Sequence, residues 1–241
     1  MTARGGTQRI PRPPDAAPGG RGPWERLPRD WQRGVNLRRL RLAFRAGDTA
    51  EAGHLEGPGW AGGPLTGGAR APAAVLVVAF EESGEAEVVL TRRSSLLRTH
   101  TDEISFPGGR LEPSETPAAA ALREAKEEVG LDPAGVEVLG SLAPLSTLSS
   151  GTALVPVVGV IDRRPALSPN PAEVARAFTV RLAELMSPSV YHQERWGRGE
   201  ASRAVHFFEL PGETVWGATA KILVELLGRV AAVPPEGAEH R

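Results

Sequence analysis

Short apolar runs separated by turn residues dominate the chain from Ala71 onward. The runs "APAAVLVVAF" and "EAEVVLTRR" are separated by the turn-like "EESGE". Continuous apolar runs of this length are typical of buried strands, so the pair predicts a buried strand followed by its neighbour. Further apolar runs alternate with turns: "VEVLGSLAPL", "LVPVVGVID", "AFTVRLAEL" and "AVHFFEL".

Two segments have helical patterns. Thr116 is a natural N-cap, Pro117 suits the first helical position, and the alanines that follow favour a helix. Gly130 lies where a residue in the left-handed conformation would end this helix. The segment "TAKILVELLGRV" predicts a closing amphipathic helix. Strands and helices together predict an α/β sandwich, with a mixed β-sheet and helices packed on it.

The N-terminal part has a different composition. Residues 1–22 are rich in Gly, Pro and Arg, which predicts disorder. The segment "WERLPRDWQRGVNLRRLRLAFRA" allows a short basic helix, which we expect to pack on its own domain or on a partner subunit rather than on a membrane. We therefore expect a largely disordered extension over 1–69, a domain over 70–230 and a disordered tail over 231–241.

Composition narrows the classes of function. Lys and Arg number 28 against 29 acidic residues, a net charge of −1, so no broad electrostatic attraction to nucleic acid or membrane is expected. The chain has no cysteine, which excludes disulfides and thiolate metal sites. No signal-peptide core and no apolar run of about 18 residues is present. We expect a cytoplasmic protein with a small-molecule substrate, for which a homodimer is an open alternative.

Three acidic residues crowd one face of the predicted helix. Glu124, Glu127 and Glu128 stand at positions i, i+3 and i+4, where like charges repel. Arg123 and Lys126 offer one compensation, in an acidic face with local ion pairs. Divalent cations offer the other, because clustered carboxylates are natural ligands of Mg²⁺ or Mn²⁺. Spacing alone leaves both interpretations open.

The residues around this cluster resemble the Nudix box of Nudix hydrolases. Every fixed position of the box is filled, and the one soft departure is Ala125, where the family prefers a bulkier aliphatic residue. The matching residues are Gly109, Glu115, Arg123, Glu124, Lys126, Glu127, Glu128, Val129, Gly130 and Leu131.

The resemblance implies a Nudix-type α/β/α sandwich and metal-dependent hydrolysis of a diphosphate. It makes Glu124 and Glu128 the expected ligands of Mg²⁺ or Mn²⁺. Glu127 is expected as a further ligand or as a base, and the carbonyl of Gly109 as an additional ligand. Glu115 and Arg123 are expected to form an ion pair that supports these ligands and fixes the loop to the helix.

Glu173, in "PNPAEV", is a further acidic candidate. Nudix enzymes often place an additional ligand or a general base on a loop after the sheet, and the resemblance supports that role here. Alternatively, Asn170 caps a helix that begins at Pro171, and Glu173 is an acid of its first turn. The two roles are compatible.

The segment Leu90–Gly109 resembles the one that precedes the box in the coenzyme A diphosphatase branch, and the match extends over about Arg70–Leu227. It implies hydrolysis of coenzyme A or acyl-coenzyme A to adenosine 3′,5′-bisphosphate and 4′-phosphopantetheine or its acyl form. Hydrolysis of ADP-ribose or another nucleoside diphosphate derivative is the alternative, and a non-catalytic ligand sensor is less favoured. The candidate substrate-binding residues are Arg93, Arg98 and His100, each of which also has a structural interpretation.

Two positions depart from this branch. Asp102 stands where the branch usually has glycine, and Thr152 where many relatives have an aromatic residue. The first departure adds a negative charge near an anionic substrate, and the second removes a ring available for stacking.

Overall fold

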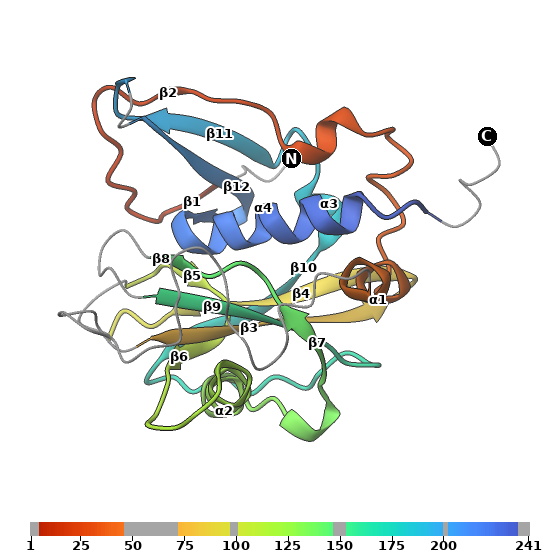
Figure 1. Cartoon of the computed structure of the whole chain (residues 1–241). Helices are drawn as coiled ribbons and strands as arrows, with labels where there is room; N and C mark the ends of the chain where they lie inside the picture. The colour runs from red at the N-terminus through yellow and green to blue at the C-terminus, as the bar shows by residue number, and fades with distance from the viewer. Residues whose placement is uncertain (1–4, 46–71, 97–100, 147–152, 200–201, 236–241) are drawn as a thin grey trace.

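The described part of the protein is layered (Figure 1). Helix α2 (Pro117–Val129) covers one face of a central mixed sheet, helix α4 (Gly217–Ala231) covers the other, and a smaller sheet lies beyond α4. The α/β architecture with a mixed sheet is therefore confirmed. The computed structural model describes residues 5–45, 72–96, 101–146, 153–199 and 202–235.

The central sheet is built around two parallel strands, β3 and β9, whereas every other pairing within it is antiparallel. Across the sheet the main strands are β10 (Val174–Arg181), β4 (Glu85–Arg93), β3 (Ala73–Glu82), β9 (Ala153–Val160) and β7 (Glu137–Ser141). Three short strands pair with these main strands: β5 (Ile104–Ser105) with β4, β6 (Gly108–Arg110) with β3, and β8 (Leu145–Ser146) with β9. Short helices complete these elements: η2 (Pro133–Gly135) and α3 (Leu182–Leu185).

A tight hairpin joins β3 to β4, as the two apolar runs predict. Ser83 and Gly84 have φ angles of 54° and 80°, so both occupy the left-handed region. Two-residue hairpins favour such a turn, because its twist matches that of the flanking strands. The hairpin aligns Glu82 with Glu85 and sets the register of the two central strands.

Helix α2 begins and ends at the predicted residues. The Thr116 side chain accepts a hydrogen bond from the Ala119 N–H (3.2 Å), and Pro117 follows as the first helical residue. At the other end Gly130 has φ 69°, and its N–H donates to the Lys126 carbonyl (3.0 Å). This left-handed position ends the helix directly after its acidic cluster.

Alternation along β3 divides the core between the two faces of the sheet. Leu76, Val78 and Phe80 belong to the core that α2 covers. Val75 and Val77 belong to the core that α4 covers. Successive side chains of a strand point to opposite faces, so one apolar strand supplies both cores.

The N-terminal residues build both edges of the smaller sheet. Its order is β1 (Gly5–Gly6), β12 (Arg203–Trp216), β11 (Tyr191–Trp196) and β2 (Ala17–Pro18). The prediction of disorder is therefore wrong for residues 5–22. The physical reason is that backbone pairing to β12 and β11 orders a segment whose own side chains bury little.

Two buried side chains hold residues 23–45 against the domain. Trp24, in the short helix η1 (Pro23–Arg26), is fully buried, and its indole N–H donates to the Met186 carbonyl (3.0 Å). Arg39, in helix α1 (Leu37–Arg45), is 1% exposed and donates to several carbonyls, including that of Val233 (2.8 Å). The basic helix therefore packs on its own domain, as expected.

The remaining predictions about the ends of the chain are tested only in part. Residues 46–69 and 236–241 lie outside the described residues. Helix α4 extends to Ala231, so the domain continues slightly past its predicted end. Within the described part of the chain, no helix is both long and apolar enough to cross a membrane.

Candidate active site

Helix α2 presents its three glutamates in different environments. Glu128, on the side toward the sheet, is 3% exposed. The Glu124 side chain is 16% exposed, and that of Glu127 is 56% exposed. The predicted acidic face therefore runs from the protein interior to solvent, which gives its carboxylates different chemistry.

Arg123 links this face to the preceding loop. Its Nε and Nη2 donate to the two carboxylate oxygens of Glu115 at 3.0 and 3.1 Å, and Nη2 also donates to the Arg110 carbonyl at 3.0 Å. Its Nη1 donates to Glu124 at 3.0 Å and to Glu127 at 3.2 Å. The hydrogen bonds from Arg123, followed by one from the Glu112 N–H, lower the pKa of Glu115. The predicted ion pair is present, and it connects loop and helix.

Glu128 is a buried carboxylate with few partners. One of its oxygens accepts the Gly108 N–H at 3.0 Å, and the other lies 3.9 Å from a guanidinium nitrogen of Arg93. The pKa of Glu128 is raised to about 7, chiefly by burial; the charges of Glu124 and Glu173 add to this rise, and the Gly108 hydrogen bond and the Arg93 charge oppose it. Burial also raises the pKa of Glu124. Nearby donors and positive charges thus compensate the negative charges of Glu124 and Glu128 only in part.

Gly109 lies directly against the acidic face. A Cβ at this position would overlap the carboxylate of Glu124. The residue belongs to β6, which pairs with β3 so that Gly109 stands opposite Ala74. Glycine is therefore the only residue that lets the strand approach Glu124 at this distance.

Glu173 comes from a distant part of the chain and acts electrostatically on the same cluster. Its charge acts on both Glu124 and Glu128, and its carbonyl accepts the Ser94 N–H at 2.8 Å. The Asn170 N–H donates to the Glu128 carbonyl at 2.8 Å, which docks this loop on the end of α2. The structure thus brings Glu173 within electrostatic range of Glu124 and Glu128.

The alternative interpretation, a helix that begins at Pro171, is wrong. The Asn170 side chain does accept the Ala172 N–H (3.2 Å), but the residues form a turn that leads into β10. Val174 pairs with Arg93 of β4, and this strand pairing replaces helix propagation. Glu173 is consequently a loop acid, the arrangement that the resemblance implies.

The charge of Asp102 is compensated locally. Its carboxylate accepts a hydrogen bond from Arg92 Nε at 3.2 Å and lies 3.1 Å from Arg92 Nη2. Asp102 has φ 61°, a left-handed conformation that glycine adopts freely and aspartate tolerates better than most residues. The backbone therefore explains why glycine suits this position.

Arg93 is the one candidate substrate-binding residue within the described part of the chain. Arg98, His100 and Thr152 lie outside the described residues. The Arg93 side chain is 30% exposed, and its Nε is buried without a hydrogen-bond partner among the described residues. A buried donor of this kind is available to an anionic ligand.

Sequence reasoning missed a buried polar network beside this region. Glu213 is 3% exposed, accepts a hydrogen bond from the Gln8 side chain at 2.6 Å and lies 3.6 Å from Arg92. The Thr214 N–H donates to the Gln8 side-chain carbonyl at 2.9 Å. The sequence carries no signal for this contact, because more than 200 residues separate the partners.

The donor set fits a hard divalent cation. Glu124, Glu127, Glu128 and Glu173 offer carboxylate oxygens, which Mg²⁺ and Mn²⁺ prefer. The raised pKa values of Glu124 and Glu128 indicate negative charge that a cation would stabilise. In the part of the chain that the structure describes, no three His, Asp or Glu side chains already stand close enough to bind a metal ion. Arg123 draws two of these carboxylates toward itself, so metal binding requires them to turn.

Comparisons with known proteins identify the family of this chain. The family profile described as "NUDIX domain" matches residues 70–204, more than half of the chain. The chain therefore belongs to the Nudix family, and it is a hydrolase.

Named relatives belong to the same family. The chain is 42% identical over 144 residues to "Uncharacterized Nudix hydrolase NudL" of Photorhabdus laumondii, a match that covers 59% of this chain and 76% of that protein. It is 36% identical over 177 residues to "Nudix hydrolase 22, chloroplastic" of Arabidopsis thaliana, covering 70% and 58%. Among solved structures, a MutT/nudix family protein from Enterococcus faecalis is similar with a TM-score of 0.47 and 15% identity, covering 84% and 72%.

Proposed function

We propose that this hydrolase cleaves the diphosphate of coenzyme A or acyl-coenzyme A, releasing adenosine 3′,5′-bisphosphate and 4′-phosphopantetheine or its acyl form. The observation that carries the reaction type is the acidic face of α2, where Glu128 accepts the Gly108 N–H and the Glu124 carboxylate lies against Gly109, with the charge of Glu173 acting on both. The choice of substrate rests on the segment Leu90–Gly109, which resembles that of coenzyme A diphosphatases and leads directly into this site.

Mg²⁺ or Mn²⁺ is the proposed cofactor. Glu124 and Glu128 are its proposed ligands, with Glu127 and the Gly109 carbonyl as further ligands. When bound, the ion supplies positive charge to the diphosphate oxygens and makes a coordinated water more acidic. Arg123 orders the carboxylates around the proposed metal site, because its five N–H groups donate to three glutamates and a backbone carbonyl.

Proton transfer is assigned to either Glu127 or Glu173. Hydrolysis requires a group that accepts a proton from the water that attacks phosphorus. Glu127 is more than half exposed and stands on the same helix face as the proposed ligands. Glu173, on the loop before β10, acts electrostatically on Glu128. Either carboxylate suits the role, and Glu127→Gln and Glu173→Gln distinguish them by the size of the loss in kcat.

Arg93 is proposed to contact a substrate phosphate. Its guanidinium lies at the edge of the carboxylate cluster, and a planar guanidinium binds phosphate oxygens in pairs. The alternation of β4 places Arg93 on the α2 side of the sheet, whereas Arg92 contacts Glu213 on the other side. Only the former is therefore positioned to reach a ligand at the acidic face.

Substrate choice is tested by the dependence of hydrolysis on the 3′-phosphate. Steady-state kinetics with coenzyme A, dephospho-coenzyme A and ADP-ribose give three values of kcat/KM for the same enzyme and metal. The proposal predicts the highest value for coenzyme A. A higher value for ADP-ribose would leave the metal site intact and replace the proposed substrate by a nucleoside diphosphate derivative.

A further inference from the structure

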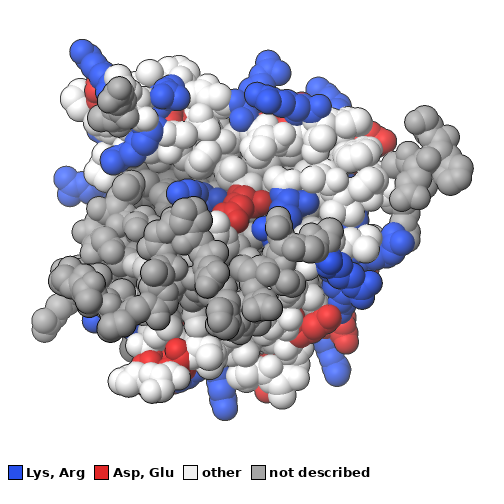
Figure 2. All heavy atoms as spheres, in the orientation of Figure 1, with Lys and Arg blue, Asp and Glu red and all other residues white. Residues whose placement is uncertain are grey.

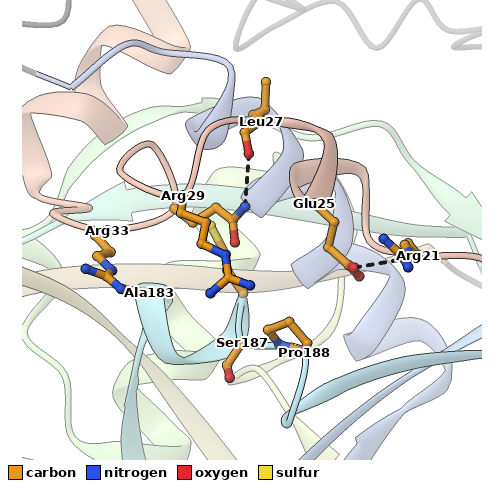
Figure 3. A pocket seen from close by; sticks show the side chains of 10 residues that line it. Arg21, Glu25, Leu27, Arg29, Arg33, Ala183, Ser187 and Pro188 are labelled. Carbon is orange, nitrogen blue, oxygen red and sulfur yellow. Dashed lines mark hydrogen bonds and ion pairs between the residues drawn. The ribbon is translucent and has the colours of Figure 1, made fainter.

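A groove lies between the N-terminal segment and helix α3 (Figure 3). It has a volume of about 610 Å³ and is formed by residues 21–33 on one side and 183–188 on the other. Leu182 and Leu185 place α3 in the core on the α4 side of the central sheet. Helix α2 covers the opposite side (Figure 1), so this groove is separate from the glutamate cluster.

The groove is positively charged. Arg21, Arg29 and Arg33 line it together with a single acid, Glu25. Neither Arg29 nor Arg33 forms an ion pair with any residue that the structure describes. The Glu25 carboxylate is already engaged, since it accepts the N–H of Gly22 at 2.8 Å and lies 3.9 Å from Arg21. Two guanidinium groups are thus free to bind an anion.

The wider surroundings strengthen this positive field. Residues 21–41 contain seven arginines and two acids, in a chain whose net charge is −1. Figure 2 shows Lys and Arg side chains along the upper rim of the molecule, where Figure 1 places η1. A concave site lined by one sign of charge concentrates ligands of the opposite sign.

Part of the groove's lining is apolar. Leu27, Ala183, Met186 and Pro188 form this part, which we call the apolar floor, and the polar Gln32 and Ser187 lie beside it. In Figure 3 the Arg29 side chain extends across the hollow toward the side that Pro188 forms. An apolar floor beneath unpaired guanidinium groups suits a ligand that combines an anionic group with a flat or aliphatic organic part.

We propose that this groove binds a phosphorylated small molecule. Arg29 and Arg33 donate to its phosphate oxygens, and the apolar floor contacts its organic part. The volume matches a ligand of about nucleotide size. Binding requires no metal ion, because the groove supplies its own positive charge. The site is independent of the proposed coenzyme A hydrolysis, and its test does not use enzymatic turnover.

Isothermal titration calorimetry of the full chain in chelator and low salt, with 2-naphthyl phosphate as the probe, tests this site. We expect saturable binding with one site per chain. The double variant Arg29→Gln/Arg33→Gln should weaken binding by about tenfold or more, since each charge-assisted hydrogen bond contributes substantially to affinity. The matched control, Arg163→Gln/Arg203→Gln, removes the same charge from exposed positions outside the groove and should leave affinity within about twofold.

A second variant keeps both arginines and blocks the groove. Ala183→Glu adds bulk and a negative charge to its wall and should also abolish binding. Thermal melting identifies any variant that does not fold. Absence of saturable binding to the wild-type protein would overturn the proposal, as would equal weakening by the groove and control double variants. Inorganic phosphate should bind more weakly than the naphthyl ester, and equal affinity would overturn the role of the apolar floor.

Discussion

Replacing Glu128 by glutamine should stabilise the metal-free protein at high pH. Burial raises the pKa of Glu128 from its ordinary value of 4.5 to about 7. Between these values the folded state binds more protons than the unfolded state, so raising the pH lowers the free energy of unfolding. This loss of stability begins as the pH rises above the pKa of Glu128 in the unfolded state. It is complete above the pKa of Glu128 in the folded state. The difference between the two pKa values corresponds to up to about 3 kcal/mol.

Urea denaturation in chelator, from about pH 5 to about pH 8, measures this effect. Glutamine retains the shape of the side chain and an oxygen that accepts the Gly108 N–H, so the hydrogen bond survives while the titration is removed. The advantage of Glu128→Gln over the wild type should therefore grow with pH by up to about 3 kcal/mol.

In saturating Mg²⁺ the wild type should be more stable than Glu128→Gln. A cation that binds the folded state stabilises it, and the variant lacks one ligand charge. Parallel pH profiles of the two proteins in chelator would refute the argument from burial. A wild type that is more stable than Glu128→Gln at high pH without metal would refute it as well.

Three further changes test the arrangement around the site. Arg123→Lys loses the paired hydrogen bonds to its acidic partners, and kcat/KM should fall by about 10- to 100-fold. Gly109→Ala displaces the Glu124 carboxylate, so a Mn²⁺ titration should show about tenfold weaker binding or worse. Gln8→Ala leaves the buried Glu213 without its amide donor, and urea denaturation should show a loss of about 1–3 kcal/mol.

Matched substitutions elsewhere provide the controls. Arg163→Lys changes an exposed arginine outside the site and should retain full activity. Gly135→Ala adds a methyl group where no atom lies within 4 Å, so Mn²⁺ affinity should be unchanged. Gln193→Ala removes an exposed hydrogen bond to the Gly20 N–H and should cost less stability than Gln8→Ala. Equal effects of a site variant and its control would contradict the corresponding role.

Helix α2 and its acidic face were predictable because their determinants are local. Thr116 caps the helix, and Gly130 ends it through a left-handed backbone conformation. The spacing of the glutamates then follows from helical geometry. The ion pair between Glu115 and Arg123 followed from the family resemblance, and the structure contains it.

The N-terminal segment was not predictable from its composition. Few of its residues bury apolar surface, which favours disorder when the segment is considered alone. Trp24 finds its partners in Met186 and Tyr191, more than 150 residues away. Order in this segment therefore depends on a surface that only the folded domain provides.

The conformation of the loop at Glu173 was also not predictable from its local sequence. Asn170 and Pro171 are compatible with a helix start and with a turn, and local preference does not decide between them. The pairing of Val174 with Arg93 selects the turn. Asp102 was recognisable in the sequence as a departure from the glycine of the coenzyme A diphosphatase branch. Its left-handed backbone conformation and its ion pair with Arg92 were visible only in the structure.

Mass spectrometry of the products formed from coenzyme A is the decisive test of metal-dependent hydrolysis at the acidic face of α2. Purified wild-type protein and Glu128→Gln are incubated with coenzyme A in Mg²⁺, in Mn²⁺ and in chelator. Our account predicts 4′-phosphopantetheine and adenosine 3′,5′-bisphosphate from the wild type with metal only, and almost none from Glu128→Gln. Products formed in chelator, or equal yields from the two proteins, would contradict the assignment of the reaction to a metal ion bound by the carboxylates of α2.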